Sequence, residues 1–181
     1  MLDFMDDERD WQRALAVAEE VAREAGKLVI EGWRAGAEVS RKGRFDLLTE
    51  YDLRSERLIR ERLQSEFPSH RIIGEEGAES GEGELVWYVD PIDGTTNFAH
   101  GHFFFAMSLA LYRGSEGLAG VVHAPALGVT WKAAKDLGAF RNDQACAVST
   151  RTELDEAVCA TGFPYDRWST PDNNHAELQL F

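Results

Sequence analysis

The sequence predicts a single domain of mixed α/β class, with helices first and a sheet after them. Apolar residues recur at steps of three and four over residues 10–32, as on one face of a helix. Beyond Pro68 this pattern gives way to short apolar runs between glycine-containing turns, which is typical of successive strands. The 181 residues can bury one sizeable core, and no linker or repeat divides residues 1–181.

Two helices are expected before Pro68. The apolar face of the first, over residues 10–32, comprises Trp11, Leu15, Ala18, Ala22, Ala25 and Val29. After a basic stretch at 41–44, Thr49 and Asp52 have the spacing of a helix-start signal in which each side chain caps the other residue's backbone. The second helix should therefore run to about Glu66, because Pro68 cannot continue it.

Strands are expected in the remainder of the chain, at residues 71–73, 85–89, 103–112, 117–124, 128–134 and 157–160. A last helix should open at residues 170–172, where Pro follows Thr. Cys146 and Cys159 are too few for a disulfide framework and lie in apolar stretches, so both are expected to be buried.

The charge balance excludes two classes of partner. Lys and Arg number 19 against 32 Asp and Glu, so the formal charge is −13. Such an acidic chain is unsuited to nucleic acid or to an anionic membrane surface. The longest apolar run, residues 103–111, is about half of what a spanning helix needs, and residues 3–8 are too acidic for a secretory signal. A cytoplasmic protein is expected.

Acidic residues gather at the ends of two expected strands. Asp90 and Asp93 follow the apolar run 85–89, and Glu75 follows the run that includes Ile72 and Ile73. If these strand ends lie side by side, three carboxylates converge, and their mutual repulsion calls for a cation. Mg²⁺ takes such oxygen ligands and completes its shell with water and phosphate.

The residues after Asp93 suit a phosphate group. Gly94, Thr95 and Thr96 offer a close backbone approach, two hydroxyls and free N–H groups at an expected helix start. Carboxylates for a metal beside amides for a phosphate indicate metal-assisted phosphoryl chemistry. Each feature alone also has an ordinary explanation, because Asp90 or Asp93 could simply cap the next helix and Glu75 could belong to a solvated acidic pair.

Taken together, these segments closely resemble the inositol monophosphatase family. The resemblance is carried by Gly74-Glu75-Glu76 and by Asp90-Pro91-Ile92-Asp93-Gly94-Thr95-Thr96-Asn97-Phe98. The sequence is also similar to that family at residues 46–52, 67–70, 138–142 and 161–165. The resemblance therefore extends from about Asp10 to Arg167. It implies a layered α-β-α-β-α sandwich.

The resemblance also implies a role for each site residue. Glu75, Asp90 and the carbonyl of Ile92 would hold a first Mg²⁺, and Asp90 with Asp93 would hold a second. Glu75 and Thr95 would orient and deprotonate the attacking water. The amides of Gly94 and Thr95 would bind the phosphate. Asp52 would act through water on a third, weaker cation, although a capping role explains Asp52 equally well.

One section of the family pattern is absent. The family's final section contains a Trp-Asp pair whose Asp binds the second Mg²⁺, and no tryptophan of this sequence is followed by Asp. The chain is therefore expected to be an incomplete copy of a longer protein, with part of its core exposed.

The expected function is Mg²⁺-dependent hydrolysis of a small phosphate monoester, myo-inositol 1-phosphate first. Histidinol phosphate, or another sugar or nucleotide monoester, is the alternative within the class. The alternative from another class is a truncated, non-catalytic copy that dimerises or binds a partner. A homodimer is expected from the resemblance alone.

Overall fold

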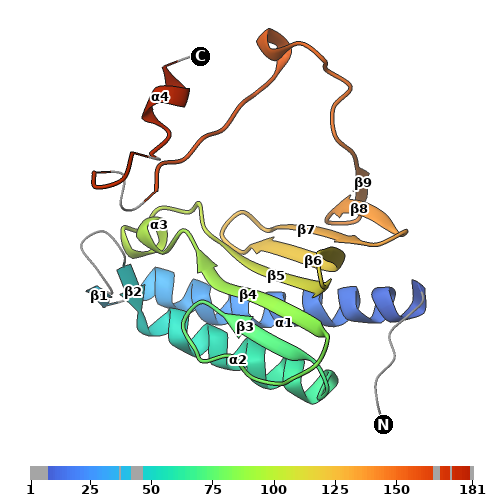
Figure 1. The fold of residues 1–181 in the computed structure, drawn as a ribbon. Helices are drawn as coiled ribbons and strands as arrows, with labels where there is room; N and C mark the ends of the chain where they lie inside the picture. Colours follow the sequence, from blue (N-terminus) through green and yellow to red (C-terminus); the bar gives the residue numbers. More distant parts are fainter. Residues whose placement is uncertain (1–7, 37, 42–46, 165–167, 172, 180–181) are drawn as a thin grey trace.

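Two long helices pack side by side against one face of a sheet (Figure 1). The structure, a computed structural model, describes residues 8–36, 38–41, 47–164, 168–171 and 173–179. Helices α1 (Glu8–Ala35) and α2 (Glu50–Glu66) form the helical layer. The mixed α/β class predicted from the sequence is confirmed, and the described residues form one helical layer and one large sheet of the expected sandwich.

The large sheet has seven strands in the order in which they occur along the chain. They are β3 (Arg71–Gly74), β4 (Leu85–Asp93), β5 (Ala106–Arg113), β6 (Glu116–Ala124), β7 (Val129–Ala134), β8 (Gly138–Arg141) and β9 (Gln144–Cys146). Strands β3 and β4 are parallel, and the later neighbours are antiparallel. A separate hairpin pairs β1 (Val39–Arg41) with β2 (Leu47–Thr49).

The start and end of α2 follow from local chemistry. Thr49 is the N-cap residue, and its backbone N–H donates to Asp52 Oδ2 at 2.8 Å. The Thr49 side chain in turn accepts from the N–H of Tyr51. At the other end, the N–H of Phe67 donates to the carbonyl of Leu63, and Pro68 follows. The predicted capping box is therefore confirmed, and it fixes where the helix begins.

The core lies between the two helices and the sheet. One face of α1 and alternate residues of β4, β5 and β6 are buried there, including Val21, Val29, Trp87, Leu109, Leu111 and Val121. The other face of the sheet carries partly exposed aromatic residues, among them Tyr88 and Trp131. On that side residues 147–164 arch away from the strands, largely as irregular backbone (Figure 1).

Several predictions about the last third of the chain are wrong. Residues 157–160 form no strand, because no neighbouring strand pairs with them, and Val158 is fully exposed. The last helix, α4 (His175–Leu178), begins later than residues 170–172; Asp172 lies outside the described residues. Cys146 and Cys159 are exposed, one on the edge strand β9 and one in this irregular segment.

Other differences concern the start of β5 and some short elements. Residues 103–105 were expected in a strand, but β5 begins at Ala106. Two side chains bind the backbone of Phe104, just before β5. Asn97 Nδ2 donates to the carbonyl of Phe104, and the N–H of Phe104 donates to His102 Nδ1. Strands β1, β2, β8 and β9 were not predicted. No helix in the described part of the chain is long and apolar enough to cross a membrane.

Candidate functional site

The parallel pairing of β3 and β4 brings two of the predicted carboxylates to the same place. Gly74 is the register partner of Val89, so Glu75 and Asp90 follow on neighbouring strands. Glu75 and Asp90 also line one shallow depression of about 370 Å³. The condition set by the sequence, that the two strand ends lie side by side, is therefore met.

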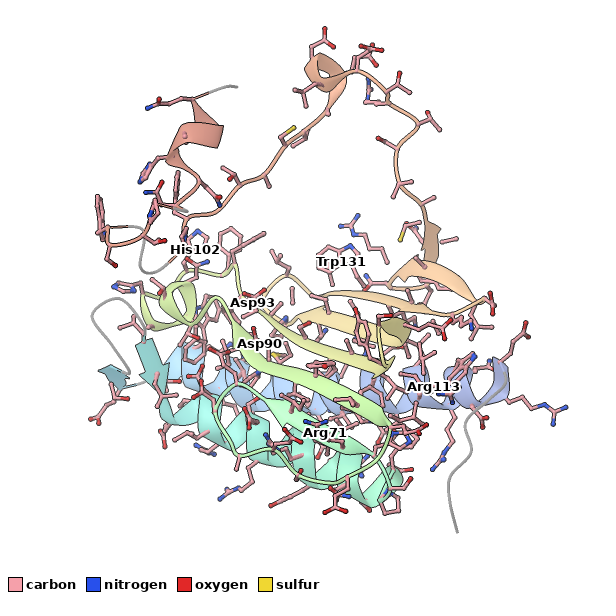
Figure 2. The ribbon with its side chains drawn as sticks, in the orientation of Figure 1. Arg71, Asp90, Asp93, His102, Arg113 and Trp131 are labelled. Carbon is pink, nitrogen blue, oxygen red and sulfur yellow. The ribbon has the colours of Figure 1, made fainter. Side chains whose placement is uncertain are left out.

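A bulge shapes the segment that carries Asp90 and Asp93. The pairing of β4 with β5 shifts register between these two residues, where Pro91 lacks the N–H of a regular ladder. The N–H of Ile92 donates to Asp90 Oδ1 at 3.2 Å, which holds the carboxylate against its own turn. Strand β4 therefore continues to Asp93 rather than ending at residue 89. Asp90 and Asp93 lie close together at the C-terminal end of β4 (Figure 2).

The carboxyl group of Asp90 is electrostatically crowded. Burial, followed by the charges of Glu75 and Asp93, raises its pKa from 3.8 to about 7, and a hydrogen bond with Glu75 contributes further. The N–H of Ile92 acts in the opposite direction but is outweighed. The negative charges beside Asp90 oppose its ionisation, and a bound cation would relieve this opposition.

Although Glu75 and Asp93 influence Asp90, the described side chains do not form a complete set of metal ligands. Among the residues that the structure describes, no group of three or more His, Cys, Asp or Glu side chains is arranged to hold a metal ion. The donors available are nonetheless all oxygen, namely three carboxylates and the carbonyl of Ile92, which suits a hard cation such as Mg²⁺.

The turn after Asp93 exposes backbone N–H groups. Gly94 adopts a left-handed conformation with φ of +89°, which favours glycine, and a Cβ there would lie 3.1 Å from the carbonyl oxygen of Phe104. Helix α3 (Thr95–Ala99) follows, and its first closing bond runs from the N–H of Phe98 to the carbonyl of Gly94. The N–H groups before Phe98 therefore have no acceptor within α3. With five residues, α3 has only a small dipole, so these N–H groups matter more than the dipole.

Asp52 connects the start of α2 with this turn. Its Oδ2 accepts from the N–H and the hydroxyl of Thr49, at 2.8 and 2.5 Å. Its Oδ1 accepts from the hydroxyl of Thr95 at 3.2 Å. The same hydroxyl lies 2.9 Å from the carbonyl of Ile92. The two sequence interpretations of Asp52 are therefore compatible, since one oxygen caps the helix and the other faces the site.

A cavity of about 630 Å³ adjoins Asp93 and Gly94. Its further walls come from the start of β5, the β6–β7 turn and Trp131, and Thr161 and Gly162 of the irregular segment complete it. Apolar side chains dominate these walls, and Asp93, Asn97 and Thr161 provide the polar ones.

Two further α2 residues support the site, and the sequence analysis did not identify them. The hydroxyl of Ser55 donates to the carbonyl of Pro91 at 3.3 Å. The Glu56 carboxylate accepts the N–H groups of Glu76 and Gly77 at 2.7 and 2.8 Å. With Asp52 they occupy one helix face, at steps of three and four. This spacing is visible in the sequence. The roles of Ser55 and Glu56, however, follow only from their contacts with residues that are distant in the sequence.

Comparison with known proteins identifies the family of this chain. Residues 10–180 match the model of the inositol monophosphatase family. An inositol-1-monophosphatase of Synechocystis is 37% identical over 172 residues, which make up 93% of this chain and 60% of that protein. The structure of an inositol monophosphatase from Anabaena is 35% identical with a TM-score of 0.80, over 92% of this chain and 61% of that one.

A Thermotoga maritima enzyme extends the comparison. Its solved structure is 37% identical with a TM-score of 0.70, over 77% of this chain and 54% of that one. A curated relative from the same organism is named fructose-1,6-bisphosphatase/inositol-1-monophosphatase and is 40% identical over 141 residues, 77% of this chain and 55% of the relative. The chain thus spans between 54% and 61% of the length of these relatives.

Proposed function

Because the chain belongs to the inositol monophosphatase family, we propose that it hydrolyses a small phosphate monoester with the help of Mg²⁺, with myo-inositol 1-phosphate as the first candidate. The observation that carries this proposal is the crowding of Asp90 by Glu75 and Asp93, directly beside the Gly94 turn, whose N–H groups have no acceptor within α3. Cation ligands and phosphate donors are thereby neighbours.

The donor set assigns the ligands. Glu75, Asp90 and the carbonyl of Ile92 would hold a first Mg²⁺, and Asp90 with Asp93 would contribute to a second. The carbonyl of Ile92 already accepts one hydrogen bond, from Thr95, and a carbonyl has a second lone pair to offer. Bound Mg²⁺ supplies a water of lowered pKa and stabilises the leaving oxygen.

The residues of the chain then position the reactants. Thr95 donates its single hydroxyl proton toward Asp52 or Ile92, so its oxygen is left to accept a hydrogen bond from the attacking water. Glu75 takes the proton of that water as general base. The N–H groups of Gly94 and Thr95 donate to phosphate oxygens, where negative charge increases during transfer.

The cavity beside Asp93 suits the alcohol part of the ester. Its volume of about 630 Å³ admits a ring of the size of inositol. Asp93 can accept a bond from a ring hydroxyl, and the exposed face of Trp131 offers an apolar surface to the C–H face of the ring. Histidinol phosphate and other sugar or nucleotide monoesters are the alternatives within the class. A relative named fructose-1,6-bisphosphatase/inositol-1-monophosphatase favours a sugar phosphate among them.

The test is release of inorganic phosphate by the purified chain from myo-inositol 1-phosphate, histidinol phosphate and fructose 1,6-bisphosphate, with and without Mg²⁺. We expect release that requires Mg²⁺ and is lost in Glu75→Gln, with the matched exposed variant Glu61→Gln retaining it. A folded chain that binds Mg²⁺ but releases no phosphate would instead favour the non-catalytic copy. That alternative rests on the share of the relatives' length that this chain does not span.

The homodimer and the cytoplasmic location stay predictions. The homodimer rests on the resemblance alone. The location rests on the two cysteines, the acidic residues 3–8 and the short apolar runs of the sequence. Sedimentation of the purified chain at several concentrations would test the homodimer.

A further inference from the structure

After β3 ends at Gly74, the chain forms a loop up to Ser80, which pairs again with Ile72 of β3. Its base is closed by a backbone pair between Ile72 and Ser80, with N–H to carbonyl distances of 2.7 and 3.0 Å. Arg71 and Glu79 form an ion pair at the same end. Glu75, the proposed first ligand and general base, lies in this loop, so the position of the Glu75 carboxylate depends on what holds the loop.

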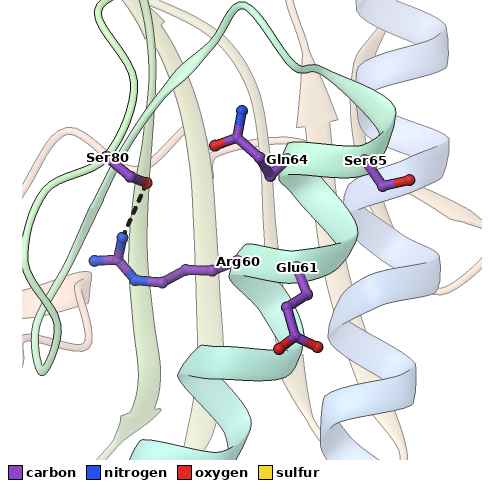
Figure 3. Close-up of a pocket in the computed structure, with 5 residues that line it drawn as sticks. All are labelled: Arg60, Glu61, Gln64, Ser65 and Ser80. Carbon is purple, nitrogen blue, oxygen red and sulfur yellow. Dashed lines mark hydrogen bonds between the residues drawn. The ribbon is translucent and has the colours of Figure 1, made fainter.

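A buried ion pair on α2 holds the middle of this loop. The Glu56 side chain is only 3% exposed, and it accepts the N–H groups of Glu76 and Gly77 while pairing with Arg60 at 2.7 Å. Arg60 reaches further along the loop, to the carbonyl of Gly77 at 3.2 Å and the hydroxyl of Ser80 at 3.3 Å (Figure 3). One pair of side chains thus binds the loop at Glu76, Gly77 and Ser80.

The glycines of the loop show how closely the carboxylate approaches the backbone. A Cβ on Gly74 would lie 2.4 Å from Glu56 Cδ, and a Cβ on Gly77 would lie 2.6 Å from Glu56 Oε1. Glu75 is flanked by Gly74 on one side and by the bound N–H of Glu76 on the other. The backbone of Glu75 is therefore fixed between two points of contact with Glu56.

We propose that Glu56, held by Arg60, is a positioning residue that sets the affinity of the first cation by fixing the backbone of Glu75. This inference rests on the proposed function, because it takes Glu75 as a ligand. Replacement of a group that orients a metal ligand typically lowers metal affinity by about 10- to 100-fold. A purely structural Glu56 would instead affect stability without affecting the cation.

The decisive variant is Glu56→Gln, which keeps the size of the side chain. Its amide oxygen can serve one of the two N–H groups well, and its NH₂ group cannot accept from the other or from Arg60. The matched control is Glu61→Gln, on the same helix but exposed and pointing away from the loop (Figure 3). Arg60→Lys is a milder second variant, since it keeps a positive charge near Glu56 and loses the forked bonds to the loop.

Two measurements test the proposal on the full chain. Calorimetric titration with Mg²⁺ alone should show an affinity about 10- to 100-fold weaker in Glu56→Gln, a smaller loss in Arg60→Lys and no change in Glu61→Gln. Hydrogen exchange should show faster exchange at Glu76 and Gly77 in Glu56→Gln, with the amide of Leu109 in the core strand β5 as the reference for global stability.

The outcomes separate the two proposals. Wild-type binding of Mg²⁺ that is unchanged in Glu56→Gln would overturn the positioning role alone. Faster exchange throughout the sheet, with Mg²⁺ affinity intact, would assign Glu56 a purely structural role. If Glu56→Gln does not fold, an Arg60→Lys variant that matches wild type in both measurements overturns the proposal. A wild-type chain that binds no Mg²⁺ would contradict the proposed function together with this inference.

Discussion

Replacing Asp90 with Asn should stabilise the metal-free protein above neutral pH. The pKa of Asp90 is raised from 3.8 to about 7, so the folded state holds more protons than the unfolded state between these two values. The free energy of unfolding should therefore fall as pH rises through that window, and Asp90→Asn should lack this fall.

The magnitude follows from the size of the shift. A difference of about three pKa units corresponds to about 4 kcal/mol at 1.36 kcal/mol per unit. Because Asp90 is partly exposed, solvent screening lowers the expected difference to about 1–2 kcal/mol. In the metal-free protein above neutral pH, the ionised Asp90 would therefore carry an electrostatic cost that a bound cation would remove.

The assay is urea unfolding in EDTA at about pH 5 and about pH 8, on either side of neutrality. Asp90→Asn should exceed wild type in stability by clearly more at the higher pH, because about pH 5 lies within the window in which stability falls and about pH 8 lies above it. Asp143→Asn, in the exposed turn between β8 and β9, should match wild type at both. Added Mg²⁺ should stabilise wild type more than Asp90→Asn, which keeps the other proposed ligands but lacks one carboxylate. An Asn variant that is less stable than wild type in EDTA at the higher pH would refute the reasoning.

Three further predictions concern the surroundings of the site. Asp52→Asn should cost about 1 kcal/mol in urea unfolding through the weakened helix cap, and should lower phosphate release by at least about tenfold through Thr95. Burial lowers the pKa of His123 below 6.5, so the free energy of unfolding should fall as pH drops below that value, and His123→Gln should flatten this part of the pH profile. Trp131→Ala should raise the KM for myo-inositol 1-phosphate with little change in kcat, because it removes ground-state contact; an unchanged KM would contradict the cavity assignment.

Local patterns were sufficient to predict the two long helices α1 and α2 and the strands β3 to β7, to within a few residues at their ends. The capping pair at Thr49 and Asp52 fixes where α2 begins. The apolar runs of β3 and β4 carry Glu75 and Asp90 to one edge, because parallel strands place their carboxyl ends together. The grouping of the candidate site was therefore accessible from the sequence, and the roles of its residues stay predictions.

The remainder depends on tertiary context. Strands β8 and β9 have largely exposed side chains and no hydrophobic alternation. Only the pairing of β8 with β7, and of β9 with β8, identifies them. Val158 lies in an apolar run typical of a strand, yet no strand of the described residues pairs with it, and its side chain is exposed. The role of Glu56 required knowing that the chain returns to α2 some 20 residues later, which no local pattern encodes.

The most direct test of the central claim is the number of protons released when Mg²⁺ binds. At pH 7 a carboxyl group with a pKa of about 7 is half protonated, and a metal ligand must be deprotonated. Calorimetric titrations in buffers of different ionisation enthalpy should therefore give about half a proton per chain at pH 7, and none in Asp90→Asn. Mg²⁺ binding without proton release, or equal release in Asp90→Asn, would contradict the assignment of Asp90 as the crowded ligand of this site.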